Sequence, residues 1–244
     1  KNLLSENPFG RRIISLNSIN WLRVMGQVSY YVWLTKQFTS PINVAIPSGN
    51  FGNAYSAWFG RANGLPVNEI LCSTNVNDVL RRFIDGGVLE PLVTQPSLAP
   101  SMDIQIPSSL ERLIFDLCSE AKTFYDHLQS NSKAQLDDKS VDTLKSIFSS
   151  VTFKDEMIKT LITSLHDEFG IIFDPHTVTS VQMALDKNST VPTVAVATAS
   201  PEKFGNVISP LINGFTESKI DQKEQYLTLS TENAEIIEAI KAFI

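Results

Sequence analysis

The sequence is poor in the residues that most often carry metal or nucleophile chemistry. It has two cysteines and three histidines among 244 residues. Cys72 and Cys118 lie far apart without the spacing of metal ligands, so we expect free thiols in a reduced compartment. His127, His166 and His176 are scattered along the chain and define no Ser/His/Asp triad and no zinc site. Metalloenzymes and triad hydrolases are therefore set aside.

Long apolar runs and concentrated patches of charge are also lacking. No segment approaches the roughly 18 apolar residues of a membrane-spanning helix. The formal net charge of −6 is spread along the chain, and no basic patch develops that could serve as a nucleic-acid surface. We therefore expect a cytoplasmic protein without membrane or nucleic-acid partners. Its hydrophobic content of 43% suffices for a sizeable core.

Helix-like and strand-like segments alternate in the first hundred residues. Apolar residues recur at steps of three and four from 19 to 38 and predict a helix. A short run rich in β-branched residues, 42–46, and a second apolar run, 69–73, predict buried strands. A helix is expected after each strand, over 54–62 and 78–84. This order predicts an α/β fold with a parallel sheet, flanking helices and right-handed crossovers.

The pattern changes in the middle of the chain. From 108 to about 168 the sequence is polar, has helical periodicity and contains no strand-like run. The α/β pattern then returns with a helix at 178–185 and a buried strand at 193–197, before a strand-like piece at 225–229 and a helix that starts near Thr231. We therefore expect three parts: the first part of an α/β domain (1–107), a helical insertion (108–170) and the closing part of the α/β domain (171–244).

The turn between the first predicted strand and the next helix is the most informative motif. It reads Ser48-Gly49-Asn50-Phe51-Gly52-Asn53. A helix N-terminus after a parallel strand presents unpaired N–H groups and the positive end of the helix dipole, which suits an anion. We expect Gly49 and Gly52 to adopt positive φ, and the Ser and Asn side chains to add donors. The absence of a Walker A lysine favours a phosphate monoester over a nucleoside triphosphate. The pattern alone leaves an ordinary tight turn open.

Three further positions are candidates that the residues alone do not decide. Thr198 follows the buried strand at 193–197, at the sheet edge where α/β proteins place ligands, or it caps the next turn. His176, beside a proline, is a base, a substrate contact or a structural residue. Ser18 and Asn20 at the start of the first helix offer donors for an anion or simply cap that helix.

Six segments, taken in order along the chain, resemble the threonine synthase family. Any one of these matches is weak, but six in register make chance very improbable. They are Asn17-Ser18-Ile19-Asn20-Trp21 with Arg23, Pro47–Asn53, Ser73-Thr74-Asn75-Val76-Asn77-Asp78, Pro100-Ser101-Met102-Asp103-Ile104, Asp174-Pro175-His176-Thr177, and Thr198-Ala199-Ser200-Pro201-Glu202-Lys203-Phe204.

The resemblance implies a fold-type II (tryptophan-synthase-like) enzyme that uses pyridoxal 5′-phosphate. Such an enzyme converts O-phosphohomoserine and water to threonine and phosphate, a carbon–oxygen lyase reaction of threonine biosynthesis. Thr198 would face the pyridine nitrogen, and Ser18, Asn20 and Arg23 are candidates for the substrate phosphate. The cofactor phosphate would be bound by Gly49, Asn50, Phe51, Gly52 and Asn53.

The sequence departs from the family in one respect. Family members carry a segment with the Schiff-base lysine, similar to TLAFKD, upstream of the region that these motifs match. No lysine here matches it, since Lys36 lies in the first predicted helix and Lys203 lies in a matched motif without that role. We therefore expect no catalytic residue in this chain alone, and a missing N-terminal half or another chain as partner. The alternatives are a truncated, non-catalytic phosphate-binding or interaction protein and an unrelated phosphate-ester enzyme.

Overall fold

The computed structural model describes Gly10 and residues 20–118, 120–215 and 233–242. The chain forms two compact units, one of residues 18–217 and one of residues 1–17 with 218–244. The described part of the second unit contains helix α11 (Asn233–Lys241), near the predicted C-terminal helix. The strand-like piece expected at 225–229 lies outside the described residues.

A four-stranded parallel sheet organises the unit of residues 18–217. Its strand order is β5-β2-β1-β6, with β1 (Ile42–Pro47) and β2 (Val67–Thr74) in the centre. The outer strands are β5 (Phe148–Thr152) and β6 (Thr193–Ala195), and both run parallel to their neighbours. The predicted parallel sheet is therefore confirmed. All six residues of β1 are buried, as the apolar run predicted.

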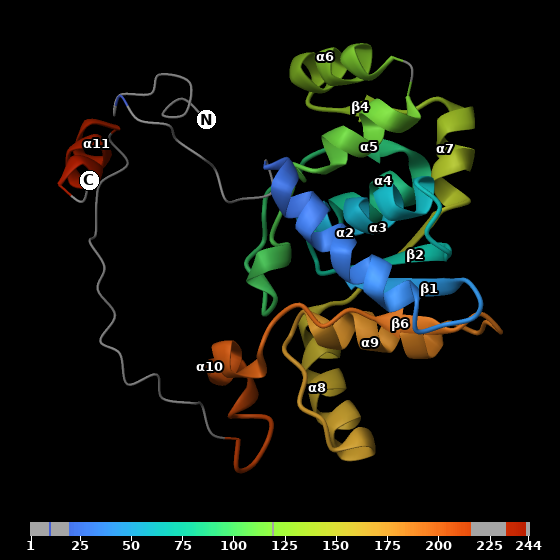
Figure 1. Cartoon of the computed structure of the whole chain (residues 1–244). Coiled ribbons are helices and arrows are strands. Elements are labelled where there is room, and N and C mark those ends of the chain that lie inside the picture. The colour runs from blue at the N-terminus through green and yellow to red at the C-terminus, as the bar shows by residue number, and fades with distance from the viewer. Residues whose placement is uncertain (1–9, 11–19, 119, 216–232, 243–244) are drawn as a thin grey trace. The chain divides into compact units, whose positions relative to one another are not determined.

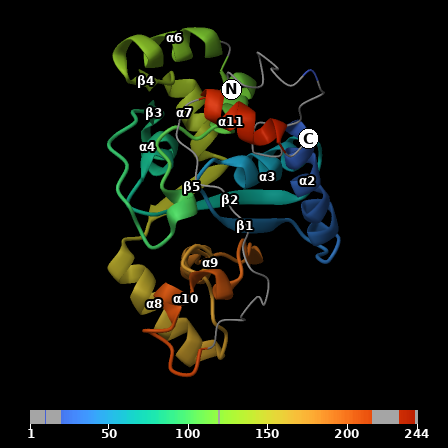
Figure 2. The same cartoon turned by 90° about the vertical axis from the view of Figure 1, so that its left-hand side faces the viewer.

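Helices cover both faces of this sheet, as Figures 1 and 2 show from two sides. One face carries α2 (Trp21–Thr35), α3 (Gly52–Ala62) and α4 (Val79–Gly86). The opposite face carries α8 (Asp155–Phe169) and α9 (Thr177–Asp186). The other elements are β3 (Val88–Leu89), η1 (Pro100–Met102), α5 (Leu110–Leu117), α6 (Ala121–Asn131), β4 (Ala134–Gln135), α7 (Asp138–Lys145), η2 (Pro201–Phe204) and α10 (Gly205–Ile208).

The expectation that no strand interrupts residues 108–168 is wrong. Strand β5 joins the main sheet beside β2, with Leu71 opposite Ser149 and Cys72 opposite Ser150. Two adjacent serines gave this segment the composition of a loop. The sheet satisfies one of them, because the Ser150 hydroxyl donates to the Cys72 carbonyl at 2.7 Å. The division of the chain at 107 and 170 remains a prediction.

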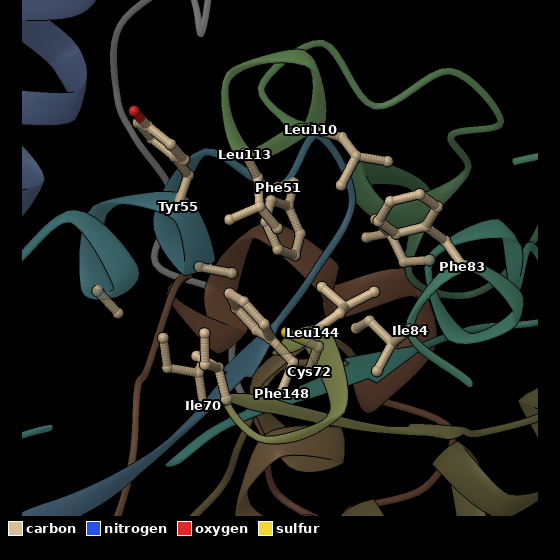
Figure 3. Close-up of a cluster of buried hydrophobic side chains, with 14 of the residues drawn as sticks. Phe51, Tyr55, Ile70, Cys72, Phe83, Ile84, Leu110, Leu113, Leu144 and Phe148 are labelled. Atoms are coloured by element: carbon tan, nitrogen blue, oxygen red, sulfur yellow. The ribbon is translucent and has the colours of Figure 1, made fainter. Parts of the chain in front are cut away.

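The core has two layers because successive strand residues point to opposite faces. Ile70 and Cys72 of β2 pack with the helices on the α3 side, whereas Leu71 between them packs with the α8 and α9 side. Figure 3 shows the first layer, in which Phe51 and Phe148 lie among Leu and Ile side chains. Burial raises the pKa of the Cys72 thiol to about 12, and both Cys72 and Cys118 are free, as expected.

Candidate functional site

The turn between β1 and α3, residues 48–53, presents a row of backbone donors at the carboxyl edge of the sheet. The N–H groups of residues 49–54 donate to no acceptor among the residues that the structure describes. No side chain caps the N-terminus of α3, whose first residue is Gly52. Such a terminus combines unpaired donors with the positive end of the helix dipole. The geometry therefore suits an anion with several acceptor oxygens, such as a phosphate group.

The expectation that Gly49 and Gly52 adopt positive φ is wrong. The left-handed residue of the turn is Phe51, with φ of 65°. Its side chain is 2% exposed, and its ring centroid lies 5.5 Å from that of Phe148 (Figure 3). Burial of the ring offsets a conformation that costs a non-glycine residue roughly 1–2 kcal/mol. The sequence pattern could not show this, because it does not reveal which side chain anchors the turn.

Gly49 is required by a neighbouring segment and not by its own φ. A Cβ atom at this position would lie 2.3 Å from the carbonyl oxygen of Ser101 and 3.1 Å from Cα of Met102. Both are backbone atoms of η1, which cannot rotate away as a flexible side chain would. The backbone of Gly49 therefore lies directly against η1, and this contact fixes the position of the β1–α3 turn.

Two polar side chains of the turn are held by the protein itself. The Ser48 hydroxyl, expected as an additional anion donor, instead donates to the carbonyl of Ile46 at 3.0 Å. The side-chain oxygen of Asn50 accepts from the Ser108 hydroxyl at 3.3 Å, and the Asn50 carbonyl accepts from the Ser109 N–H at 3.0 Å. The segment before α5 therefore braces the turn from the side of Asn50.

Two tyrosines of α2 orient the Asn53 side chain. The hydroxyls of Tyr30 and Tyr31 both donate to Asn53 Oδ1, at 2.5 and 2.6 Å. An amide whose oxygen accepts two hydrogen bonds must direct its NH₂ group elsewhere. The Nδ2 atom donates to no acceptor within the described part of the chain, so two further donors remain for a ligand.

Both tyrosines stay protonated at any ordinary pH. Burial raises the pKa of Tyr30 to about 12 and raises the pKa of Tyr31 well above its usual value. Their hydroxyls therefore remain hydrogen-bond donors to Asn53. Sequence reasoning placed this pair in the first helix without a role. Its signal was two adjacent tyrosine hydroxyls on one helix, but the partner depends on how α2 packs against α3.

Thr198 lies beside the β1–α3 turn at the same edge of the sheet. Strands β1 and β6 pair in parallel up to Ala45 and Ala195, and Ser48 and Thr198 each stand three residues beyond that pair. The backbone N–H of Thr198 donates to the Thr177 hydroxyl at 3.1 Å, and its side chain is exposed. A ligand bound at the turn therefore has the Thr198 hydroxyl next to it along the sheet edge.

Asn20 holds the start of α2. The Asn20 side-chain oxygen accepts from the N–H of Leu22 at 2.9 Å, which makes Asn20 the N-cap. Ser18, expected to cap this helix and to bind substrate, lies outside the described residues. Arg23 is exposed in the first turn of α2.

Helices α2 and α3 pack antiparallel, which separates the start of α2 from the candidate site. Trp21 packs on Phe59, with 5.1 Å between ring centroids, whereas Tyr31 contacts Asn53 in the first turn of α3. Arg23 and Tyr31 are eight positions apart along the helix, or about 12 Å. The structure thus brings the tyrosines to the β1–α3 turn but does not bring Asn20 and Arg23 there, whose substrate role stays a prediction.

Neither a metal-binding cluster nor a membrane-spanning helix is present among the described residues. No group of three or more His, Cys, Asp or Glu side chains among them is arranged to hold a metal ion. In the same part of the chain, no helix has the length and apolar character needed to cross a membrane.

Threonine synthases are found both among the curated relatives and among the solved structures that resemble this chain. No protein-family model matches the chain. Threonine synthase of Pseudomonas aeruginosa is 31% identical over 93% of this chain and 52% of its own length. Threonine synthase-like 1 of Homo sapiens is 32% identical over 82% of this chain and 29% of its own. The crystal structure of PLP-bound threonine synthase from Brucella melitensis superposes with a TM-score of 0.85 at 28% identity, over 93% of this chain and 52% of that one. The chain spans about half the length of the curated relatives that it matches.

Proposed function

Because the chain belongs to the threonine synthase family, we propose that it binds pyridoxal 5′-phosphate and contributes to the conversion of O-phosphohomoserine and water into threonine and phosphate. The observation that carries this proposal is the set of N–H groups at residues 49–54, which donate to no acceptor in the described part of the chain. They would receive the phosphate group, together with the amide nitrogen of Asn53. A cytoplasmic location is part of the same proposal.

The chemistry divides between the cofactor and the chain. When bound, pyridoxal phosphate supplies an electron sink for carbanion chemistry. Backbone donors of Gly49, Asn50, Phe51, Gly52 and Asn53 would hold its phosphate, with the buried Phe51 ring fixing the turn. The Thr198 hydroxyl would donate to the ring nitrogen, as a neutral partner. Ser18, Asn20 and Arg23 stay predictions for the substrate phosphate.

We further propose that the Schiff-base lysine comes from polypeptide outside these 244 residues. The exposed apolar side chains of α2 are where that polypeptide would pack. Leu22, Met25 and Trp33 are 74%, 41% and 65% exposed, and their spacing places them on one side of the helix. Large apolar side chains gathered on one helix face usually meet a partner. Relatives about twice as long as this chain have the additional residues to supply one.

A second candidate function is a non-catalytic, threonine-synthase-like module that binds a phosphate ester or a protein. The observation that favours it is the likeness to a protein named threonine synthase-like 1, together with the coverage of only half of the relatives' length. The two candidates share the β1–α3 turn and differ in catalysis. Formation of threonine from O-phosphohomoserine, assayed with and without the polypeptide that supplies the lysine, separates them.

The test of the cofactor site compares the binding of pyridoxal phosphate and inorganic phosphate in variants of two threonines, Thr198 and Thr143. We expect pyridoxal phosphate to stabilise the chain against urea by about 2.7 kcal/mol at 100 times its dissociation constant, and inorganic phosphate to compete with it. Thr198→Val should weaken pyridoxal phosphate about tenfold, the value of one hydrogen bond, and leave inorganic phosphate unchanged. Thr143→Val on α7, whose hydroxyl bonds only the carbonyl of Lys139 among the described residues, is the matched control.

Two results would contradict the proposal. The first is binding of pyridoxal phosphate that inorganic phosphate does not displace. The second is a stoichiometric adduct on Lys36 or Lys203, found by mass spectrometry after borohydride reduction in the presence of pyridoxal phosphate. Such an adduct would place the Schiff-base lysine within this chain, whereas we expect none on either residue.

A further inference from the structure

Three buried residues before and at the start of α9 connect the two ends of the proposed cofactor site. Asp174, His176 and Thr177 are 0%, 3% and 2% exposed. Asp174 Oδ1 accepts from the backbone N–H of His176 at 2.9 Å and lies 2.8 Å from Nδ1 of its ring. Because a carboxylate accepts, the Nδ1 atom carries a proton and donates it to Asp174.

The other ring nitrogen of His176, Nε2, accepts a hydrogen bond from η1. The backbone N–H of Ser101 donates to His176 Nε2 at 3.2 Å, which agrees with the proton being on Nδ1. Burial alone would raise the pKa of Asp174, but the hydrogen bonds that it receives outweigh burial and lower this pKa below its usual value. The Asp174 carboxylate is therefore ionised at neutral pH and keeps the imidazole in the tautomer that accepts from Ser101.

Ser101 is also the residue against which the β1–α3 turn rests. Its carbonyl oxygen lies 2.3 Å from the place where a Cβ atom of Gly49 would be. The N–H of Ser101 thus bonds to His176, while its carbonyl bounds the backbone of Gly49. A displacement of His176 therefore reaches the phosphate end of the site through one residue of η1.

Thr177 holds the opposite end. Its hydroxyl oxygen accepts from the backbone N–H of Thr198 at 3.1 Å. Thr177 follows His176 directly, so a single rigid stretch of chain contacts both Ser101 and Thr198. The Thr179 hydroxyl donates to the carbonyl of His176 at 2.7 Å and fixes this stretch to the first turn of α9.

We propose that Asp174, His176 and Thr177 act as a spacer that sets the separation between the β1–α3 turn and Thr198. They are positioning residues, since none of them is placed in contact with the ligand. The spacer would select a ligand of fixed length that carries a phosphate at one end and a ring nitrogen acceptor at the other. This inference rests on the proposed cofactor site and adds to it the residues that determine which ligand length fits.

The test depends on comparing a ligand that spans the site with one that occupies a single end. Pyridoxal phosphate requires both ends at the right separation, whereas inorganic phosphate requires only the turn. His176→Phe keeps a ring for the contact with Phe204, whose centroid is 4.9 Å away, but removes the donor to Asp174 and the acceptor for Ser101. We expect the affinity for pyridoxal phosphate to fall at least tenfold more than the affinity for inorganic phosphate. His176→Gln retains an acceptor for Ser101 and should therefore recover part of the lost affinity for pyridoxal phosphate relative to inorganic phosphate.

His127→Phe provides the matched control, because His127 is exposed on α6 and should leave both affinities unchanged. If His176→Phe does not fold, Thr177→Val and Thr177→Ser decide the question. The valine variant should lower the ratio of the affinity for pyridoxal phosphate to the affinity for inorganic phosphate about fivefold. The serine variant should restore this ratio. Equal losses for both ligands, or no loss for either, would overturn the spacer. Failure of the unaltered chain to bind pyridoxal phosphate would instead overturn the proposed function.

Discussion

Two neighbouring turns at the same edge of the sheet differ in the carboxylates that lie against them. In the β1–α3 turn the N–H groups of residues 49–54 donate to no acceptor within the described part of the chain. In the β2–α4 turn, residues 75–78, the side chains bond to acidic and basic groups of the protein itself. Asp103 accepts from the side chains of Asn75 and Asn77 at 2.6 and 2.9 Å, and from the hydroxyl of Ser97 at 2.7 Å.

The second turn also has its own anion at the helix start. Asp78, the N-cap of α4, pairs with Arg81 and Arg82 at 2.6 and 3.0 Å. Two carboxylates of the protein thus lie at the β2–α4 turn, although no side chain caps the N-terminus of α4 among the described residues. Negative charge at this turn disfavours an external anion. No carboxylate contacts residues 48–53 in the described part of the chain, and this difference favours the β1–α3 turn as the place for an anion.

Removal of the internal carboxylate should have the largest effect on stability. Asp103→Ala takes one acceptor from the side chains of Asn75, Asn77 and Ser97, and we expect a loss of about 3 kcal/mol in the free energy of unfolding, measured in urea. Ser101→Ala is the control, because this exposed side chain lies two residues away and should change stability by no more than roughly 0.5 kcal/mol. Equal values for the two variants would mean that the β2–α4 turn does not depend on Asp103.

The second prediction concerns the contact between the open turn and η1. Gly49→Ala should destabilise the chain by about 2 kcal/mol, because its Cβ would meet backbone atoms, and should weaken the binding of inorganic phosphate. Gly26→Ala on α2 has no heavy atom within 4 Å of the added Cβ and should be neutral or stabilising. Urea denaturation with and without phosphate measures both effects. Unchanged phosphate affinity in Gly49→Ala would mean that the position of the turn does not matter for binding.

The smallest effect is expected at Asp78 and depends on pH. Burial alone would raise the pKa of this carboxyl, but the hydrogen bonds from Arg81 and Arg82 outweigh it and lower the pKa. A lowered pKa in the folded chain contributes stability above the unfolded value of about 3.9 and loses it as the pH falls through the folded value. Asp78→Asn should therefore cost about 1 kcal/mol at pH 7. The difference from the unaltered chain should shrink below about pH 4, and a constant difference across that range would contradict the ion pairs.

The sequence predicted the fold wherever a segment had a strong local pattern. The apolar runs of β1, β2 and β6 are recognisable without knowledge of the rest of the chain. Strand β5 was missed because the hydroxyl of Ser150 finds its acceptor on the neighbouring strand, which the local sequence does not reveal. Strand pairing of this kind depends on tertiary contacts, and the hydrophobic periodicity of a short segment does not reveal them.

The candidate site was located by its glycines, but the sequence did not reveal how the site is held. The turn at residues 48–53 was expected for its donors, and those donors are present. The tyrosines that orient Asn53, the contact of η1 with Gly49, and the bond from Ser101 to His176 all join segments distant in sequence. Several of the motifs that resemble the family thus serve to position one another.

The left-handed Phe51 makes the core and the ligand respond to each other. A conformation that a buried ring helps to maintain will relax if the packing around Phe148 loosens, and the donors of the turn will then lose their alignment. Conversely, a ligand bound at the turn would oppose that relaxation. By thermodynamic linkage, the binding free energy lost in a cavity variant at Phe148 should equal the difference between the ligand's stabilisation of the unaltered chain and its stabilisation of the variant. Core substitutions remote from any ligand atom then become quantitative probes of the binding turn.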